Sequence, residues 1–334
     1  MIKSLLADAD LEHDLPLERL LWYVGFSYLD EVTIEYSDSV KANYDWSEIF
    51  NSSTINKNGQ VCISNNCRNV KNIQPSQSIE TEASIIDLAS TITSALNIAS
   101  PDGNKGNPLT DLNASHVVTI LVDGLGYQIM SDASILGLTP NIDNLPDSFL
   151  SHTVYPPSTR VATSAFLTGA KPEENGVTHN SMRTIELQTL FSAIELSGKN
   201  SIAIEGESLP VNLIDTQVIL SGDKDANGST DDNVFANTID ILNNPQLPDF
   251  LFTHFHGIDD AGHYFGVGSE EHYASIQSID VMISEIIQQL PSGTLMIIFA
   301  DHGMHVDPEN PFEGTHGNLI KEDMLIPIIF YQIP

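Results

Sequence analysis

Short, continuous runs of apolar residues divide the second part of this 334-residue chain. A run of this kind is typical of a strand that is buried on both faces of a sheet. Strands that alternate with helices form mostly parallel sheets with helices on both faces, so we predict an α/β fold of that type. The runs are residues 117–122, 250–255, 295–299 and 326–331, and helical stretches lie between them, for example at 163–167 and 274–290.

A segment rich in Pro, Gly and Asn, residues 100–108, separates this part from the N-terminal third of the chain. We expect a small N-terminal α+β region of unknown role at 1–110 and the main core at 111–334. Within the first region we expect a strand at 31–36, a hairpin turn at Asn58-Gly59 and a helix at 79–98.

Cys62 and Cys67 are the only cysteines in the chain. They are consistent with two thiols or with a local disulfide. A metal pair is not expected, because no nearby residue completes a site.

The charge of the chain excludes several classes of partner. Lys and Arg number 13 against 45 Asp and Glu, which gives a net charge of −32. A surface this acidic repels phosphate backbones and anionic lipids, so we expect no binding to nucleic-acid duplexes. An anionic substrate would need a local reversal of sign, such as a bound metal ion.

Two features of the sequence bear on the location of the protein. No apolar run reaches the ~20 residues of a transmembrane helix. Residues 1–10 do not read as a signal peptide, because Asp8 and Asp10 interrupt them. A cytoplasmic protein is the default expectation, and the oligomeric state is left open.

Asp and His residues follow the predicted strands at the places where the strands end. Asp123 follows the first run, Asp259, Asp260 and His263 follow the second, and Asp301-His302 follow the third. In parallel sheets the active site lies beyond the carboxyl ends of the strands. Aspartate and imidazole are common ligands of zinc-like ions. Together with His316 in a later loop, these residues predict a metal site.

A candidate nucleophile lies in the segment Tyr155-Pro-Pro-Ser-Thr159. Two prolines followed by Ser-Thr indicate the start of a helix, where free N–H groups and the helix dipole favour a phosphate. Alternatively, Ser158 is a plain N-cap and Thr159 a surface residue. A threonine hydroxyl needs a base or a metal ion to act as a nucleophile near neutral pH.

These motifs resemble the type I phosphodiesterase/nucleotide pyrophosphatase branch of the alkaline phosphatase superfamily, over about residues 115–331. The resemblance rests on the strand-end Asp123, on an Asp-x-x-x-His pair and on the Asp-His-Gly-Met motif. The family's nucleophile lies ten residues before the Gly of a Thr-Gly pair, which is Thr159 here, and its phosphate-binding Asn falls on Asn180. The other matching residues are Asp259 with His263, Asp301 with His302, and His316 with Gly317.

The resemblance implies an alkaline-phosphatase-like fold and two divalent metal ions, with zinc preferred over manganese. One ion would be held by Asp259, His263 and His316. The other would be held by Asp123, Asp301, His302 and the Thr159 oxygen.

The implied reaction is the hydrolysis of phosphodiester or nucleotide pyrophosphate bonds through a phospho-threonine intermediate. The substrate would be a small phosphorylated molecule such as a nucleotide. Two alternatives stay open: a phosphomonoesterase or phosphonate hydrolase on the same core, and a metal-holding structural or adhesion protein without turnover.

Several weaker signals complete the set. His254 and His256 share one strand face near Asp259, so they are candidates for residues that support the metal ligands or for core packing. Asp280 is expected to be solvated or to cap a helix. Asp223, Asp225, Asn227 and Asp231 are spaced like a calcium loop, with a solvated acidic turn as the alternative.

Overall fold

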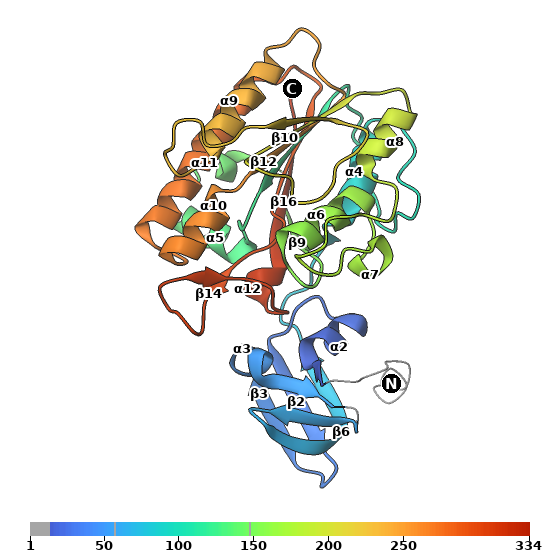
Figure 1. Cartoon of the computed structure of the whole chain (residues 1–334), viewed down its shortest axis with the longest axis vertical. Coiled ribbons are helices and arrows are strands. Elements are labelled where there is room, and N and C mark those ends of the chain that lie inside the picture. The colour runs from blue at the N-terminus through green and yellow to red at the C-terminus, as the bar shows by residue number, and fades with distance from the viewer. Residues whose placement is uncertain (1–13, 57, 147) are drawn as a thin grey trace.

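The computed structural model describes residues 14–56, 58–146 and 148–334. A large sheet with helices on both faces forms most of the molecule, and a smaller sheet lies at one end of it (Figure 1). The interpretation of residues 1–10 as lacking a signal peptide falls outside the described residues.

The large sheet has eight strands, and five neighbouring strands run parallel, which confirms the predicted mostly parallel α/β fold. The sixth, β16, is antiparallel to both of its neighbours, β13 and β9. Three of the predicted runs match strands to the residue. The order is β11 (Gln217–Leu220), β10 (Ser201–Glu205), β12 (Phe250–Phe255), β8 (Val117–Val122), β13 (Leu295–Phe299), β16 (Leu325–Gln332), β9 (Ser148–His152) and β7 (Ala83–Ser84).

Strand β8 lies between β12 and β13, and all six of its residues are buried. Val117 pairs with Phe250 on one side and with Leu295 on the other, so the three strands start level. Because they are parallel and of similar length, they also end at the same edge. The residues that follow them are therefore close in space although they are far apart in sequence.

Helices cover both faces of this sheet (Figure 1). Helix α6 packs on it through Phe166, whose ring centroid lies 5.6 Å from that of Phe252 and 4.8 Å from that of Phe299. One face carries α4 (Asp87–Ala95), α6 (Thr159–Thr168), α7 (Pro172–Asn175) and α8 (Leu190–Leu196), and the other carries α5 (Tyr127–Ile135), α9 (Asp231–Leu242), α10 (Gly257–Phe265) and α11 (Glu270–Gln289).

Short elements complete this part of the chain. The hairpin of β14 (His305–Val306) and β15 (Gly314–Thr315) and helix α12 (Lys321–Met324) follow β13. The 3-10 turn η2 (Ile142–Asn144) precedes β9.

The smaller sheet has six strands, all paired antiparallel. Cys62 and Cys67 form a disulfide across the pair β5–β6, so one of the two options for these cysteines is realised. Trp46 is fully buried in this region. In chain order the elements are β1 (Leu15–Pro16), α2 (Leu17–Tyr23), β2 (Glu31–Tyr36), β3 (Lys41–Asp45), α3 (Trp46–Ile49), η1 (Phe50–Ser52), β4 (Ser53–Ile55), β5 (Gln60–Ile63) and β6 (Asn66–Ser76).

The segment expected to be one helix at 79–98 is different in the structure. It begins with strand β7, which pairs with β9 in the large sheet, and only then enters α4. The apolar residues that suggested one long helix belong partly to β7 and partly to the shorter helix α4. Both elements pack on the same core, so both carry apolar residues. The change from the small sheet to the large one thus falls between residues 76 and 83, before the boundary expected near residue 110.

No helix within the described ranges combines the length and the hydropathy needed to cross a lipid bilayer.

Candidate metal centre and nucleophile

The three strand-end aspartates meet at one edge of the large sheet. Asp123 follows β8 and is 2% exposed, and Asp301 follows β13 and is fully buried. Asp259 lies in the first turn of α10, close to Gly124. Gly124 has a φ of +74°, and a Cβ built on it would lie 3.0 Å from the Cα of Asp259. A side chain at this position would push the two loops apart, which explains the glycine after Asp123.

Asp123, Asp301 and His302 form one potential ligand group. The His302 Nε2 atom lies 3.3 Å from Asp123 Oδ1 and 3.4 Å from Asp301 Oδ2. With metal–ligand bonds of about 2.0–2.1 Å, neighbouring ligand atoms of a tetrahedral zinc site are about 3.3–3.4 Å apart. The spacing of these atoms fits a small divalent cation.

A second group contains Asp259, His302 and His316. His316 Nε2 lies 3.8 Å from Asp259 Oδ1, while His263 Nε2 lies 3.3 Å from the other oxygen, Oδ2. All three residues of the implied set Asp259, His263 and His316 are therefore adjacent. His302 is a member of both ligand groups. Its imidazole stacks on that of His316 at a centroid distance of 3.8 Å.

Backbone carbonyl groups orient these three histidines. The Nδ1 atom of His263 lies 2.8 Å from Gly314 O, that of His302 lies 3.0 Å from Gly303 O, and that of His316 lies 2.9 Å from Pro157 O. Nδ1–H donation to a carbonyl leaves Nε2 with its lone pair free, which is the tautomer that binds metals.

Each aspartate of this site has one buried oxygen atom without a hydrogen-bond partner among the described residues. Within the described part of the chain, Asp123 Oδ1, Asp259 Oδ1 and Asp301 Oδ2 are buried and accept no hydrogen bond. Buried unpaired charges of this kind are costly unless a cation compensates them. Burial and the neighbouring Asp123 raise the pKa of Asp301 to about 7. Burial opposes a charge on His302, yet Asp301, Asp123 and Asp259 raise its pKa to about 9. The donor set thus fits divalent cations.

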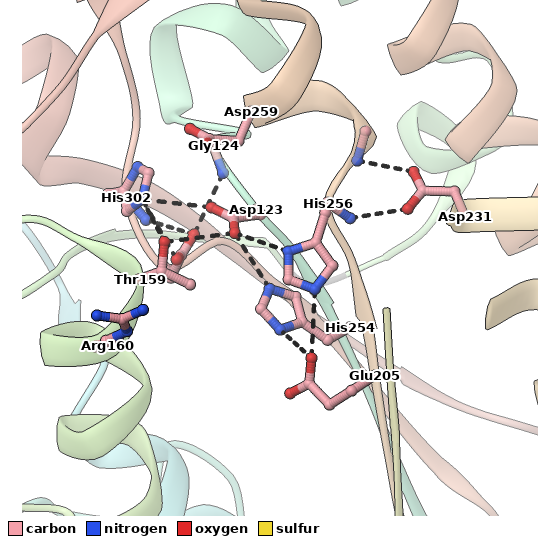
Figure 2. A network of polar contacts seen from close by, with 12 residues as sticks. Asp123, Gly124, Thr159, Arg160, Glu205, Asp231, His254, His256, Asp259 and His302 are labelled. Carbon is pink, nitrogen blue, oxygen red and sulfur yellow. Dashed lines mark hydrogen bonds and ion pairs between the residues drawn. The ribbon is translucent and has the colours of Figure 1, made fainter. Parts of the chain in front are cut away.

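Thr159, the first residue of α6, faces this group (Figure 2). Its Oγ1 atom lies 3.4 Å from His302 Nε2 and 3.5 Å from Asp123 Oδ2. Ser158 is the N-cap residue, but its side chain makes no capping hydrogen bond and its buried hydroxyl has no partner among the described residues. The alternative of Thr159 as a plain surface residue does not agree with this placement.

Asn180 lies at the same helix start, as the resemblance implies. Its Oδ1 atom accepts a hydrogen bond of 3.3 Å from the backbone N–H of Arg160, and its backbone carbonyl accepts one from the Arg160 guanidinium. Asn180 is exposed, so the rest of its amide is accessible to a ligand.

His254 and His256 lie on the other side of Asp123, against Glu205 (Figure 2). Asp123 Oδ2 is 3.4 Å from His254 Nε2 and 3.3 Å from His256 Nδ1. Glu205, fully buried at the end of β10, was not singled out in the sequence. Like Asp123, it precedes a glycine, but the strand that it ends was not predicted, so this position did not stand out in the sequence.

The structure brings three of the four residues of the calcium-like loop together and separates the fourth, Asp231, from them. Asp223 and Asp225 accept hydrogen bonds from the backbone of Asn227, as in a solvated turn. The Asp231 carboxylate lies elsewhere, because it accepts hydrogen bonds of 2.9 Å from the backbone N–H groups of both His256 and Gly257. Asp231 therefore positions the start of α10.

Asp280 does cap a short helix, but it is buried rather than solvated. It is 1% exposed on α11, and its Oδ1 accepts hydrogen bonds from the N–H groups of Asn141 and Ile142 at the start of η2.

Comparison with known proteins gives matches at several levels. The sequence model of the type I phosphodiesterase/nucleotide pyrophosphatase family matches residues 117–200 and 208–314. GPI ethanolamine phosphate transferase 3, catalytic subunit, is 33% identical in Mus musculus and 32% in Homo sapiens, in each case over 84 residues. That segment is 25% of this chain but only 7% of each relative, so the match spans a small part of their length.

Solved structures with a similar arrangement include two relatives of low sequence identity. Murine ectonucleotide pyrophosphatase/phosphodiesterase 5, as an inactive variant in complex with AMP, is 14% identical with a TM-score of 0.49, over 66% of this chain and 88% of that chain. Phosphonoacetate hydrolase from Sinorhizobium meliloti 1021, in complex with phosphonoformate, is 16% identical with a TM-score of 0.46, over 57% of each chain.

The resemblance drawn from the motifs is confirmed by the family match, which includes Asp123, Thr159 and the Asp259–His263 pair. That match covers more than half of the chain, and this protein therefore belongs to the type I phosphodiesterase/nucleotide pyrophosphatase family.

Proposed function

We propose that this protein hydrolyses phosphodiester or nucleotide pyrophosphate bonds with Thr159 as the nucleophile. The observation that supports this most directly is the position of Thr159 Oγ1, within 3.5 Å of both Asp123 and His302. A hydroxyl beside two ligands of one group would contact the same cation as those ligands.

The metal content proposed is two divalent ions, with zinc favoured by the mixed imidazole and carboxylate donors. Asp123, Asp301, His302 and Thr159 would hold one ion, and Asp259, His263 and His316 would hold the other. When bound, such ions lower the pKa of a hydroxyl, neutralise phosphate charge and stabilise a leaving oxygen.

The chain's own residues complete the reaction. Thr159 Oγ1 forms a bond to phosphorus as the bond to the leaving oxygen breaks. Water then attacks the phospho-threonine, which releases the phosphate product and restores the hydroxyl. Asn180 and the free N–H groups at the start of α6 would donate hydrogen bonds to the phosphate oxygens.

The test compares Thr159→Ala, Thr159→Ser and the control Ser158→Ala. Each purified variant is offered a nitrophenyl monoester and a nitrophenyl nucleotide diester, and its metal content is measured by mass spectrometry. We expect Thr159→Ala to abolish turnover with metal content nearly unchanged, and Thr159→Ser to keep part of it. Full turnover in Thr159→Ala would disprove the nucleophile.

The pair of substrates also separates the alternatives. Preference for the diester supports the proposal, whereas preference for the monoester indicates a phosphomonoesterase on the same core. Metal binding without turnover of either, or of a phosphonate, would favour a metal-holding structural protein.

A further inference from the structure

A third group of potential metal ligands lies beside the two that the family resemblance accounts for. It consists of Asp123, His254 and His256, whose ligand atoms all lie within 4.8 Å of one another. Neither histidine belongs to the proposed two-ion centre. We propose that Asp123 Oδ2, His254 Nε2 and His256 Nδ1 bind a third divalent cation, of the zinc or manganese type.

The spacing of the three atoms fits such an ion. Asp123 Oδ2 lies 3.4 Å from His254 Nε2 and 3.3 Å from His256 Nδ1. These distances equal the spacing of about 3.3–3.4 Å between neighbouring ligands in a tetrahedral site with bonds near 2.0–2.1 Å. The same separations occur in the Asp123–Asp301–His302 group.

Glu205 orients both imidazoles from the opposite side. Its Oε2 atom lies 3.0 Å from His254 Nδ1 and 3.3 Å from His256 Nε2 (Figure 2). One carboxylate thus accepts an N–H from each ring and leaves the other nitrogen of each ring directed at Asp123. This carboxylate–histidine–metal arrangement is typical of metal sites.

One buried nitrogen without a hydrogen-bond partner points into the same place. His254 is fully buried, and its Nε2 atom has no hydrogen-bond partner within the described ranges. The two rings lie 3.8 Å apart between their centroids, and their Asp123-facing nitrogens lie within 4.8 Å of each other and of the Asp123 oxygen. A dication held there by two neutral imidazoles would balance the charges of Asp123 and Glu205.

The donor types also select the class of ion. Two imidazole nitrogens and one carboxylate oxygen suit zinc, manganese or iron, whereas magnesium and calcium prefer oxygen ligands. His256 is partly exposed, with 22% of its side chain accessible, so an ion can reach the site without unfolding.

The first test measures metal per chain in the full-length protein after loading with Zn²⁺ and dialysis. We expect His256→Gln and His254→Gln each to bind one ion fewer than the wild type. His305→Gln is the matched control, because His305 also faces a carboxylate, Asp323, at 2.7 Å but belongs to none of the three groups. Equal metal content in the wild type and in both histidine variants would overturn the proposal.

A second test needs no variant. Crystals of the wild type soaked in Zn²⁺ should give an anomalous peak bounded by Asp123, His254 and His256, and a zinc-soaked crystal without that peak would overturn the site. Separately, Glu205→Gln should lower the affinity for this ion on the order of 10–100-fold, because it changes a residue that orients the ligands and removes none of them.

The third-ion proposal is independent of the hydrolase proposal. Thr159→Ala should lose turnover and still bind this ion.

Discussion

The carboxylate of Glu18 accepts a hydrogen bond of 2.8 Å from the hydroxyl of Tyr155. Its other oxygen accepts one of 3.2 Å from the backbone N–H of Leu319. Tyr155 begins the segment that ends at Thr159, and Leu319 follows His316 closely. A single buried side chain from the N-terminal region thus connects two loops of the candidate active site.

Replacement of Glu18 should therefore affect both stability and activity. In Glu18→Ala the buried Tyr155 hydroxyl and the Leu319 N–H lose their acceptor, so we expect the free energy of unfolding to fall by about 2–3 kcal/mol. We also expect a lower kcat, because the loops that hold Thr159 and His316 lose a common support. Urea unfolding and turnover are the measurements, with the exposed Glu48→Ala as the control. Unchanged values for both quantities would contradict this role.

Asn180 is expected to act on turnover without affecting metal content. Since its Oδ1 accepts from Arg160, its NH₂ group is left to donate to a phosphate oxygen. Asn180→Ala should lower kcat/KM on the order of 10²-fold, as the loss of one such donor does elsewhere. Asn180→Asp should lower it further through repulsion of the anion. The control is the neighbouring Ser181→Ala, and an Asn180→Ala enzyme as active as that control would argue against phosphate binding.

Asp280 should be important for stability alone. It accepts hydrogen bonds from two backbone N–H groups and, over 2.7 Å, from the side chain of Asn141. Asp280→Ala leaves these donors unpaired, so we expect a loss of about 2–4 kcal/mol in the free energy of unfolding. Glu285→Ala, on the exposed side of the same helix, is the matched control. A loss below 1 kcal/mol, measured by urea unfolding, would show that the cap is dispensable.

His152 should make the protein sensitive to mild acid. Burial, with a smaller contribution from Lys171, lowers its pKa to about 4. The folded state therefore keeps this imidazole neutral, while the unfolded chain takes up a proton below its usual pKa of about 6.5. The resulting stability is complete above pH 6.5 and is lost as the pH falls from 6.5 towards 4, by on the order of 2 kcal/mol.

The measurement is the free energy of unfolding between pH 7.5 and pH 4 for the wild type, His152→Gln and a control at the exposed His179. The His152→Gln curve should be flatter over this interval. Parallel curves for all three proteins would assign the acid sensitivity to other groups.

The candidate metal ligands were predictable because they lie next to the strongest signals in the chain. Asp123 directly follows the buried strand β8, Asp301 comes two residues after the end of β13, and parallel strands bring such positions to one edge. Thr159 faces these aspartates from the start of a helix, and its prediction also depended on the family resemblance. A Ser-Thr pair at a helix start is usually only a cap.

Other features depended on contacts between distant segments that no local pattern records. Glu18 reads as a surface residue of a short helix, but it is 8% exposed because two loops close over it. Strands β9, β10 and β11 were not predicted, since their runs are short and contain polar residues. In the same way, the sequence left Asp280 as a solvated or a capping residue, and only the contact with η2 shows that it is a buried cap.

The order of the ligands along the chain has a consequence for biosynthesis. Thr159 and His302, which lie 3.4 Å apart at the centre of the site, are separated by 143 residues in sequence. A ribosome that has added Thr159 must add 143 further residues, up to and including His302. The two candidate ligand groups, which share His302, can therefore form only after strands β10, β12 and β13 have been synthesised.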